Sequence, residues 1–146
     1  MSTLMNRSLV HGRLLSAVLR VDAAAVAVLA AGLLVVSGPI EDHLGLPTTL
    51  SLVVGVALLP WLAVLLRAAS RPVRAGMILG IVAGNAVWVV ASVALQVADG
   101  ADLTGAGTAF VLVQALGTAV IAGLEYLGLR QARRRDPSAR LTSASS

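Results

Sequence analysis

Four long apolar stretches constrain this chain more than any other feature of its sequence. They cover about 15–37, 49–66, 75–97 and 105–129, and a helix needs about 20 residues to cross a hydrocarbon layer of about 30 Å. Open sheet edges cannot be satisfied in lipid, so these spans are expected to be helices. Charged residues make up 12% of the chain, against about 25% in a soluble domain. We predict an all-α membrane protein, a four-transmembrane-helix bundle over 15–130, between a segment 1–14 and a disordered tail 131–146.

Turn and cap residues separate the predicted spans. Glycine and proline end helices, and hydroxyl or carboxylate side chains cap their first turns. Thr104 or Asp102 is suited to cap the fourth span. The break between the first and second spans is expected from Ser37-Gly38-Pro39 to Leu46-Pro47-Thr48-Thr49. The next two breaks are expected at Arg71-Pro72 and at Ala98-Asp99-Gly100.

The charges predict the orientation. All eleven basic residues are arginines on one side of the predicted bundle, and the opposite connections carry acidic charge, at Glu41, Asp42, Asp99 and Asp102. Cytoplasmic connections of membrane proteins are enriched in arginine and lysine, so we expect both termini in the cytoplasm (N-in/C-in) of a bacterial cytoplasmic membrane. The arginines are Arg7, Arg13, Arg20, Arg67, Arg71, Arg74, Arg130, Arg133, Arg134, Arg135 and Arg140.

Two other interpretations of these charges were weighed. Arginines before an apolar core at 23–36 also fit a cleaved signal peptide, but Pro39 directly after Ser37-Gly38 is a poor start for a mature chain. The high isoelectric point fits nucleic-acid binding. The arginines flank the spans without interleaved aromatic residues, so no nucleic-acid partner is expected.

The sequence lacks the residues for most catalytic chemistry. There is no cysteine, and the two histidines, His11 and His43, fall on opposite sides of the predicted membrane. No nucleophile–base or metal constellation is evident. We therefore predict no enzymatic activity, no cofactor and no metal.

A run of small residues marks one face of the third span. Gly76, Gly80 and Gly84 recur every four residues and continue into Trp88. Such a face lets another helix approach closely. It predicts either packing within the bundle or a homodimer interface.

Five of the polar residues within the spans are candidates for a site, because polar and ionisable side chains are costly in lipid. Asn85 lies near the middle of the third span, and Gln114 and Thr118 lie near the middle of the fourth. They are either hydrogen-bonding residues that fix helix packing or the lining of a polar pocket. Asp22 and Glu125 are expected near the cytoplasmic boundary, either in an ion pair with an arginine or as a proton or cation site.

Several local sequences resemble a set of small, uncharacterised four-helix integral membrane proteins of high-GC Gram-positive bacteria. They are Leu19-Arg20-Val21-Asp22-Ala23, Leu44-Gly45-Leu46-Pro47, Asn85-Ala86-Val87-Trp88-Val89-Val90 and Leu124-Glu125-Tyr126-Leu127-Gly128-Leu129-Arg130. The architecture is loosely DoxX-like. The resemblance implies the four-helix fold and carries no biochemical activity.

Two functional hypotheses follow. The first is a non-enzymatic membrane protein that acts by binding lipid, a membrane-protein partner or a second copy of itself. The second is a small proton- or cation-coupled transporter or channel that uses the membrane carboxylates Asp22 and Glu125. The sequence favours the first, because polar residues in the spans are few.

Overall fold

The computed structural model describes residues 9–97 and 102–134, and this part of the chain is almost entirely helical. Four of its helices are long and apolar enough to cross a membrane, as predicted. The elements in chain order are β1 (Leu9–Val10), α2 (Arg13–Val35), α3 (Ser37–Leu44), α4 (Thr48–Ser70), β2 (Val73–Arg74), α5 (Ala75–Val97) and α6 (Gly105–Arg134).

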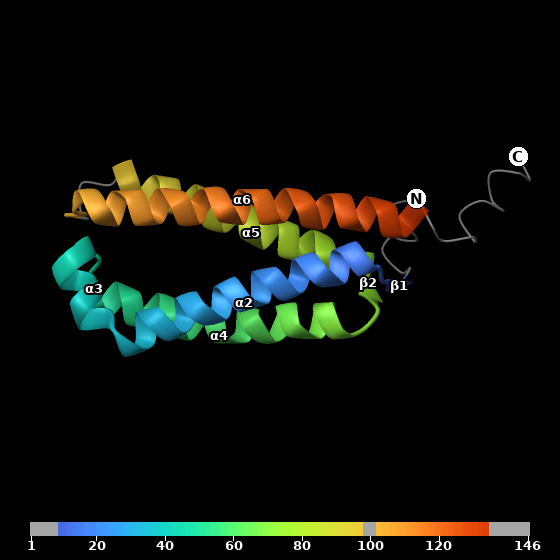
Figure 1. Ribbon diagram of the computed structural model, residues 1–146, viewed down its shortest axis with the longest axis horizontal. Coiled ribbons are helices and arrows are strands. Elements are labelled where there is room, and N and C mark those ends of the chain that lie inside the picture. Colours follow the sequence, from blue (N-terminus) through green and yellow to red (C-terminus); the bar gives the residue numbers. More distant parts are fainter. Residues whose placement is uncertain (1–8, 98–101, 135–146) are drawn as a thin grey trace, which may run out of the picture.

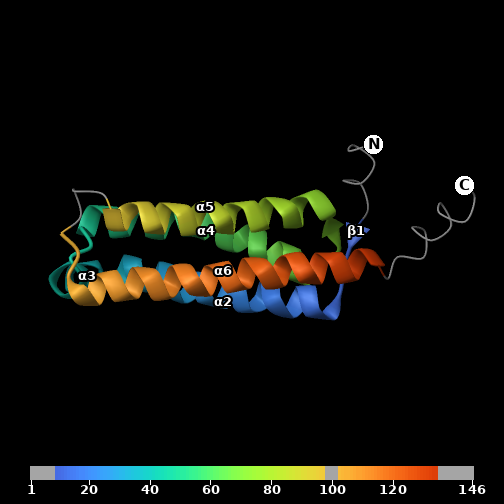
Figure 2. The ribbon, with the colours of Figure 1, turned by 90° about the horizontal axis from the view of Figure 1, so that it is seen from above.

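The four long helices form a bundle of two pairs. Consecutive helices pack most closely, α2 with α4 and α5 with α6, and the two pairs lie one above the other in Figure 1. In the view from above, α5 lies over α4 and α6 lies over α2 (Figure 2). Each long helix therefore contributes one side to the interior of the bundle.

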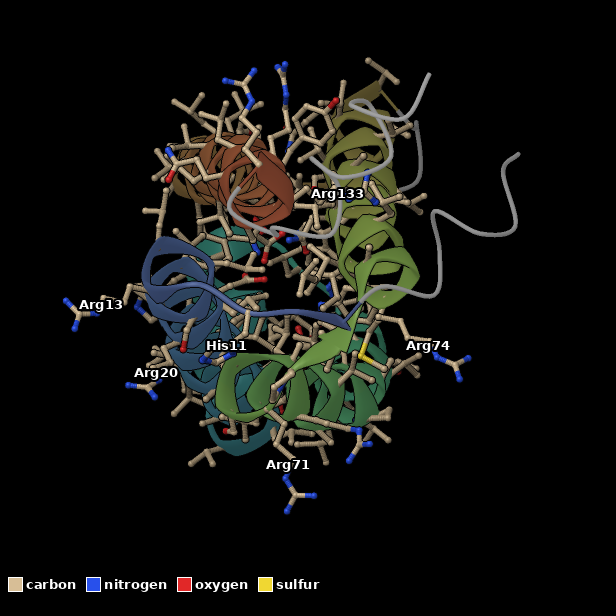
Figure 3. The ribbon with its side chains drawn as sticks, turned by 90° about the vertical axis from the view of Figure 1, so that its right-hand side faces the viewer. His11, Arg13, Arg20, Arg71, Arg74 and Arg133 are labelled. Carbon is tan, nitrogen blue, oxygen red and sulfur yellow. The ribbon has the colours of Figure 1, made fainter. Side chains whose placement is uncertain are left out.

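An apolar core joins the two pairs near the arginine-rich end. Leu19, Leu65, Ile78 and Leu129 are fully buried there, one from each long helix. Lipid supplies no hydrophobic drive between helices, so this core joins the pairs through close van der Waals packing. Arg13, Arg20, Arg71 and Arg74 point outward from this end (Figure 3).

A short strand pair covers the same end and was not predicted. β1 pairs antiparallel with β2, with Val10 opposite Val73. Both valines are buried, and β1 crosses the end of the bundle to reach β2 (Figure 3). The strands lie beyond the apolar spans, so their edges are not exposed to hydrocarbon.

The opposite end contains a helix where the sequence analysis expected a loop. α3 follows α2 after a break at Val36, and Pro39 lies in its first turn, where the missing N–H has no helical partner in any case. Gly45 ends α3 in the left-handed conformation, with φ at 71°. Thr104 then joins α3 to the start of α6, because its N–H donates to Leu44 O (3.1 Å) and its hydroxyl to His43 O (2.7 Å).

The cap residues of α4 and α6 differ in kind. Thr104 Oγ1 accepts a hydrogen bond from Gly107 N (3.0 Å), so Thr104 caps α6 as one of the two expected candidates. At α4 the expected hydroxyl cap is replaced by a carboxylate. Glu41 Oε2 accepts hydrogen bonds from the Thr48 N–H (3.0 Å) and from the Thr48 hydroxyl. Glu41 therefore links α3 to the first turn of α4.

Three of the long helices differ from the predicted spans. α2 covers Arg13–Val35 instead of 15–37, α4 continues to Ser70 instead of 66, and α6 continues to Arg134 instead of 129. Residues 131–134 are thus helical and not part of a disordered tail. α5 has the predicted bounds. The expectations for Arg7, Asp99, Arg135, Arg140 and the tail 135–146 lie outside the described residues.

Candidate intramembrane site

Three of the five polar intramembrane residues meet inside the bundle. Asp22 comes from α2, Asn85 from α5 and Glu125 from α6, and their side chains are 3%, 3% and 0% exposed. Asn85 Nδ2 donates hydrogen bonds to Asp22 Oδ2 (3.2 Å) and to Glu125 Oε2 (3.1 Å). One amide thus bridges two carboxyl groups across three helices.

The three residues lie at similar distances from the arginine-rich ends of their helices. Asp22 lies nine residues after Arg13, Glu125 nine residues before Arg134, and Asn85 ten residues after the start of α5. At 1.5 Å per residue, each is about 13–15 Å from the arginine-rich end of its helix.

The expected ion pair with an arginine is not formed among the described residues. Arg20, Arg67, Arg74 and Arg130 are exposed at the surface of the bundle, whereas Asp22 and Glu125 are buried. Long arginine side chains can direct their charge to the membrane surface, which leaves the carboxyl groups to each other.

The amide of Asn85 also brings the carboxyl groups of Asp22 and Glu125 close to each other. Two like charges held close together in a buried site repel each other, so the pair is suited to share one proton. Glu125 Oε1 is buried and receives no hydrogen bond within the described part of the chain. A proton shared by the pair would satisfy this oxygen and would remove one of two like charges from a medium that penalises both.

A cavity of about 290 Å³ opens onto this cluster. Asp22 and Asn85 form part of its wall, whereas Glu125 is absent from the lining and lies behind them. Gln114 and Thr118 of α6 also line it, so four of the five polar residues face one space. The remaining lining residues are apolar or aromatic: Val26, Leu29, Val54, Ala57, Leu58, Trp61, Gly84 and Trp88.

Hydrogen bonds within the wall hold two of its polar side chains. Trp88 Nε1 donates to Gln114 Oε1 (3.0 Å), which joins α5 to α6. The Thr118 hydroxyl donates to the backbone oxygen of Gln114 (3.0 Å), within α6. Gln114 therefore serves helix packing through Trp88, while Thr118 makes no bond to another helix in the described residues.

A second cavity of about 200 Å³ adjoins the first on the side of α3. Leu29, Val54, Trp88 and Gln114 line both cavities. Its wall is mainly apolar and reaches Leu46 and Phe110. Ser51 is an exception, with a buried hydroxyl that has no hydrogen-bond partner among the described residues.

The glycine face of α5 does not act as one continuous surface. Gly84 is covered by the ring of Trp61, which occupies the space a methyl group would need. Trp88 is half-buried and faces the cavity, and Gly76 is half-buried. Gly80 is exposed, with nothing near the position of a Cβ atom. The close approach at Gly84 is therefore made by a tryptophan of the same chain.

The sequence carries no signal that would place Trp61 or Ser51 in the site. Trp61 lies near the end of an apolar span, where interfacial aromatic residues are common, and a single serine in such a span has no distinctive signal. The position of Trp61 in the sequence does not show which side of α4 faces the interior of the bundle. The nine residues expected at the site thus divide between the cavity wall, the buried cluster and the outer surface.

Comparison of the chain with protein-family models, curated proteins and solved structures finds no match. The described residues also contain no group of three or more His, Cys, Asp or Glu side chains placed to hold a metal ion.

Proposed function

We propose that this protein is a small proton-coupled transporter of the bacterial cytoplasmic membrane, with both termini in the cytoplasm. The observation that carries the proposal is the buried carboxyl pair, bridged by Asn85, with Asp22 facing a cavity. Ionisable groups within a membrane are costly and commonly mark proton or substrate pathways. The cavities together have the size of a small-molecule site, about 300–1,000 Å³.

The geometry supports exchange between a proton and a ligand at the pair. Asp22 is accessible from the cavity, and Glu125 behind it is the more protected group. A ligand bound at Asp22 would compete with the shared proton for the same charge. Binding on one side of the membrane and proton uptake on the other would then be linked by occupancy of one site.

A pH-step measurement on proteoliposomes adsorbed to a solid-supported membrane tests this proposal without a known substrate. Wild-type protein is expected to give a transient current as protons bind the pair. Asp22→Asn and Glu125→Gln should each abolish it, because either amide removes the shared proton site while keeping the side-chain size. Glu41→Gln, on exposed α3, is the matched control and should keep the current.

Circular dichroism and size-exclusion chromatography of each variant separate loss of the proton site from loss of the fold. Well-folded Asp22→Asn and Glu125→Gln variants with wild-type currents would refute the proposal.

Self-association is a second candidate, favoured by one observation. Gly80 is exposed on α5 with open space at the Cβ position, and small residues permit close contact between helices in lipid. Native mass spectrometry from mild detergent tests it. A dimer in the wild type that Gly80→Leu converts to monomer would support a non-enzymatic assembly role, and a wild-type monomer would exclude the Gly80 interface.

A further inference from the structure

The cavity next to Asp22 has charge of one sign. Asp22 is its only ionisable lining residue, and no arginine of the described chain contributes to the wall. The arginines near this depth, Arg20 and Arg130, are exposed on the outside of the bundle. A ligand group that meets Asp22 therefore finds a negative or proton-bearing partner and no competing positive charge, which favours a cation and disfavours an anion.

Two aromatic rings share the wall with Asp22. Trp61 reaches the cavity from α4, where its ring packs on Gly84, and Trp88 reaches it from α5. The faces of tryptophan rings attract cations, most strongly those with a weakly hydrated organic charge. The indole N–H of Trp88 is already bonded to Gln114, so this ring is held in place. The wall thus combines a carboxyl group with aromatic surface.

The space extends away from this charge along an apolar wall. The second cavity continues from the first toward α3, lined on α2 by Leu29 and Leu33. From Asp22 to Leu33 is eleven residues of α2, or about 16 Å along the helix axis. A ligand that fills both cavities would therefore have one polar end and an elongated apolar body.

We infer that the ligand of this site is an amphiphilic organic monocation, with its charged group beside Asp22 and its apolar body along the second cavity. This inference rests on the proposed function, because it names the ligand of the same site. On binding, the proton held by Asp22 and Glu125 passes to water, and the cation takes its place beside the two ionised carboxyl groups. Exchange of one proton for one monovalent cation keeps the net charge of the site unchanged.

The chain supplies its own reporter for this test. It contains two tryptophans, Trp61 and Trp88, and both line the cavity. Intrinsic tryptophan fluorescence of the full chain in lipid nanodiscs therefore reports on the site. Decyltrimethylammonium, decanol and decyl sulfate are the probes, because they share one tail and differ in the charge of the head. Empty nanodiscs give the partition of each probe into lipid.

The expected result is a saturable fluorescence change with decyltrimethylammonium and a non-saturating, partition-like change with the other two probes. Asp22→Asn should weaken the cation's affinity by at least about tenfold, since it removes the buried charge partner. In a weakly buffered sample, the cation should release about one proton per molecule bound, as expected for ligand and proton competing at one pair. Glu41→Gln, which removes an exposed carboxyl group on α3 outside both cavities, should leave the affinity unchanged.

Three outcomes would overturn the inference. They are equal saturable binding of decanol, preferred binding of decyl sulfate, and cation binding that Asp22→Asn does not weaken. Any of these with the pH-step current intact would reject the ligand class and leave the proposed function standing. Loss of the proposed function is recognised separately, by currents that persist in Asp22→Asn and Glu125→Gln.

Discussion

Asn85 is the residue on which the buried cluster depends. Its amide donates to both carboxyl groups, so Asn85→Ala leaves two buried acceptors without this donor. Side-chain hydrogen bonds in membranes contribute about 0.6 kcal/mol each on average, and a loss of about 1 kcal/mol or more in the free energy of unfolding is expected. Unfolding by sodium dodecyl sulfate in mixed micelles measures it.

Thr118→Val is the matched control for that prediction. Its hydroxyl bonds to the backbone of its own helix, so its removal breaks no contact between helices. Stability of Asn85→Ala equal to that of Thr118→Val would show that the bridge contributes nothing to the fold.

At the residue scale, the sequence identified the polar side chains but not their partners. Asp22, Asn85 and Glu125 were singled out because each interrupts an apolar span. Their contact depends on how three helices are rotated about their axes and on where each helix begins and ends. Apolar stretches without sharp boundaries do not determine either property. The expected ion pairs with arginine are not formed among the described residues. Spacing in the sequence does not show which side chains of different helices meet.

At the scale of the helices, α2 and α6 are in close contact at Gly128. A Cβ atom at Gly128 would lie 3.1 Å from the Cα atom of Leu15, which is backbone and cannot turn aside. Gly128→Ala should force the helices apart and cost about 1–3 kcal/mol, the usual range for overpacking. Gly123→Ala, on the same helix with open space, should be neutral or slightly stabilising. Thermal unfolding of both variants in one detergent measures the difference, and equal melting temperatures would contradict the close contact.

The link between α3 and α4 is expected to depend on pH. Hydrogen bonds from the Thr48 hydroxyl and then the Thr48 N–H lower the pKa of Glu41, an exposed group outside the spans. The link is therefore complete above the ordinary pKa of a glutamate and is lost as the pH falls through the lowered pKa. The Thr48 amide chemical shift, followed by NMR during acidification, should change with a midpoint below that of an ordinary glutamate. Glu41→Gln should abolish this titration, and a midpoint at the ordinary value would contradict the contact.

The sequence predicted the long helices better than the short elements. Long, mostly apolar stretches are unambiguous signs of membrane-spanning helices, and the bounds of α5 were predicted correctly. α3 and the β1–β2 pair have few residues, and their formation depends on distant partners such as Thr104 and Val73. Local sequence carries little information about such contacts.

At the scale of the whole molecule, the orientation is a direct test of the charge argument. The chain has no cysteine, so single cysteines can be introduced without a background. Asp42→Cys, on α3, should react with a membrane-impermeant maleimide in intact cells. Ser70→Cys, at the arginine-rich end of α4, should react only after the membrane is permeabilised. The reverse pattern would place the termini outside.

The order of the helix pairs has a consequence for biogenesis. α2 and α4 are made first and pack on each other, whereas both partners of Asp22 belong to α5 and α6. During synthesis, Asp22 therefore lies in the membrane without Asn85 and Glu125 until α5 and α6 are inserted. Asp22 gains both partners, Asn85 and Glu125, only when the pair of α5 and α6 is inserted. The first buried carboxyl group is therefore fully paired only after the last helix has entered the membrane. A nascent chain that stops before α5 would retain in its first helix a carboxyl group without either partner.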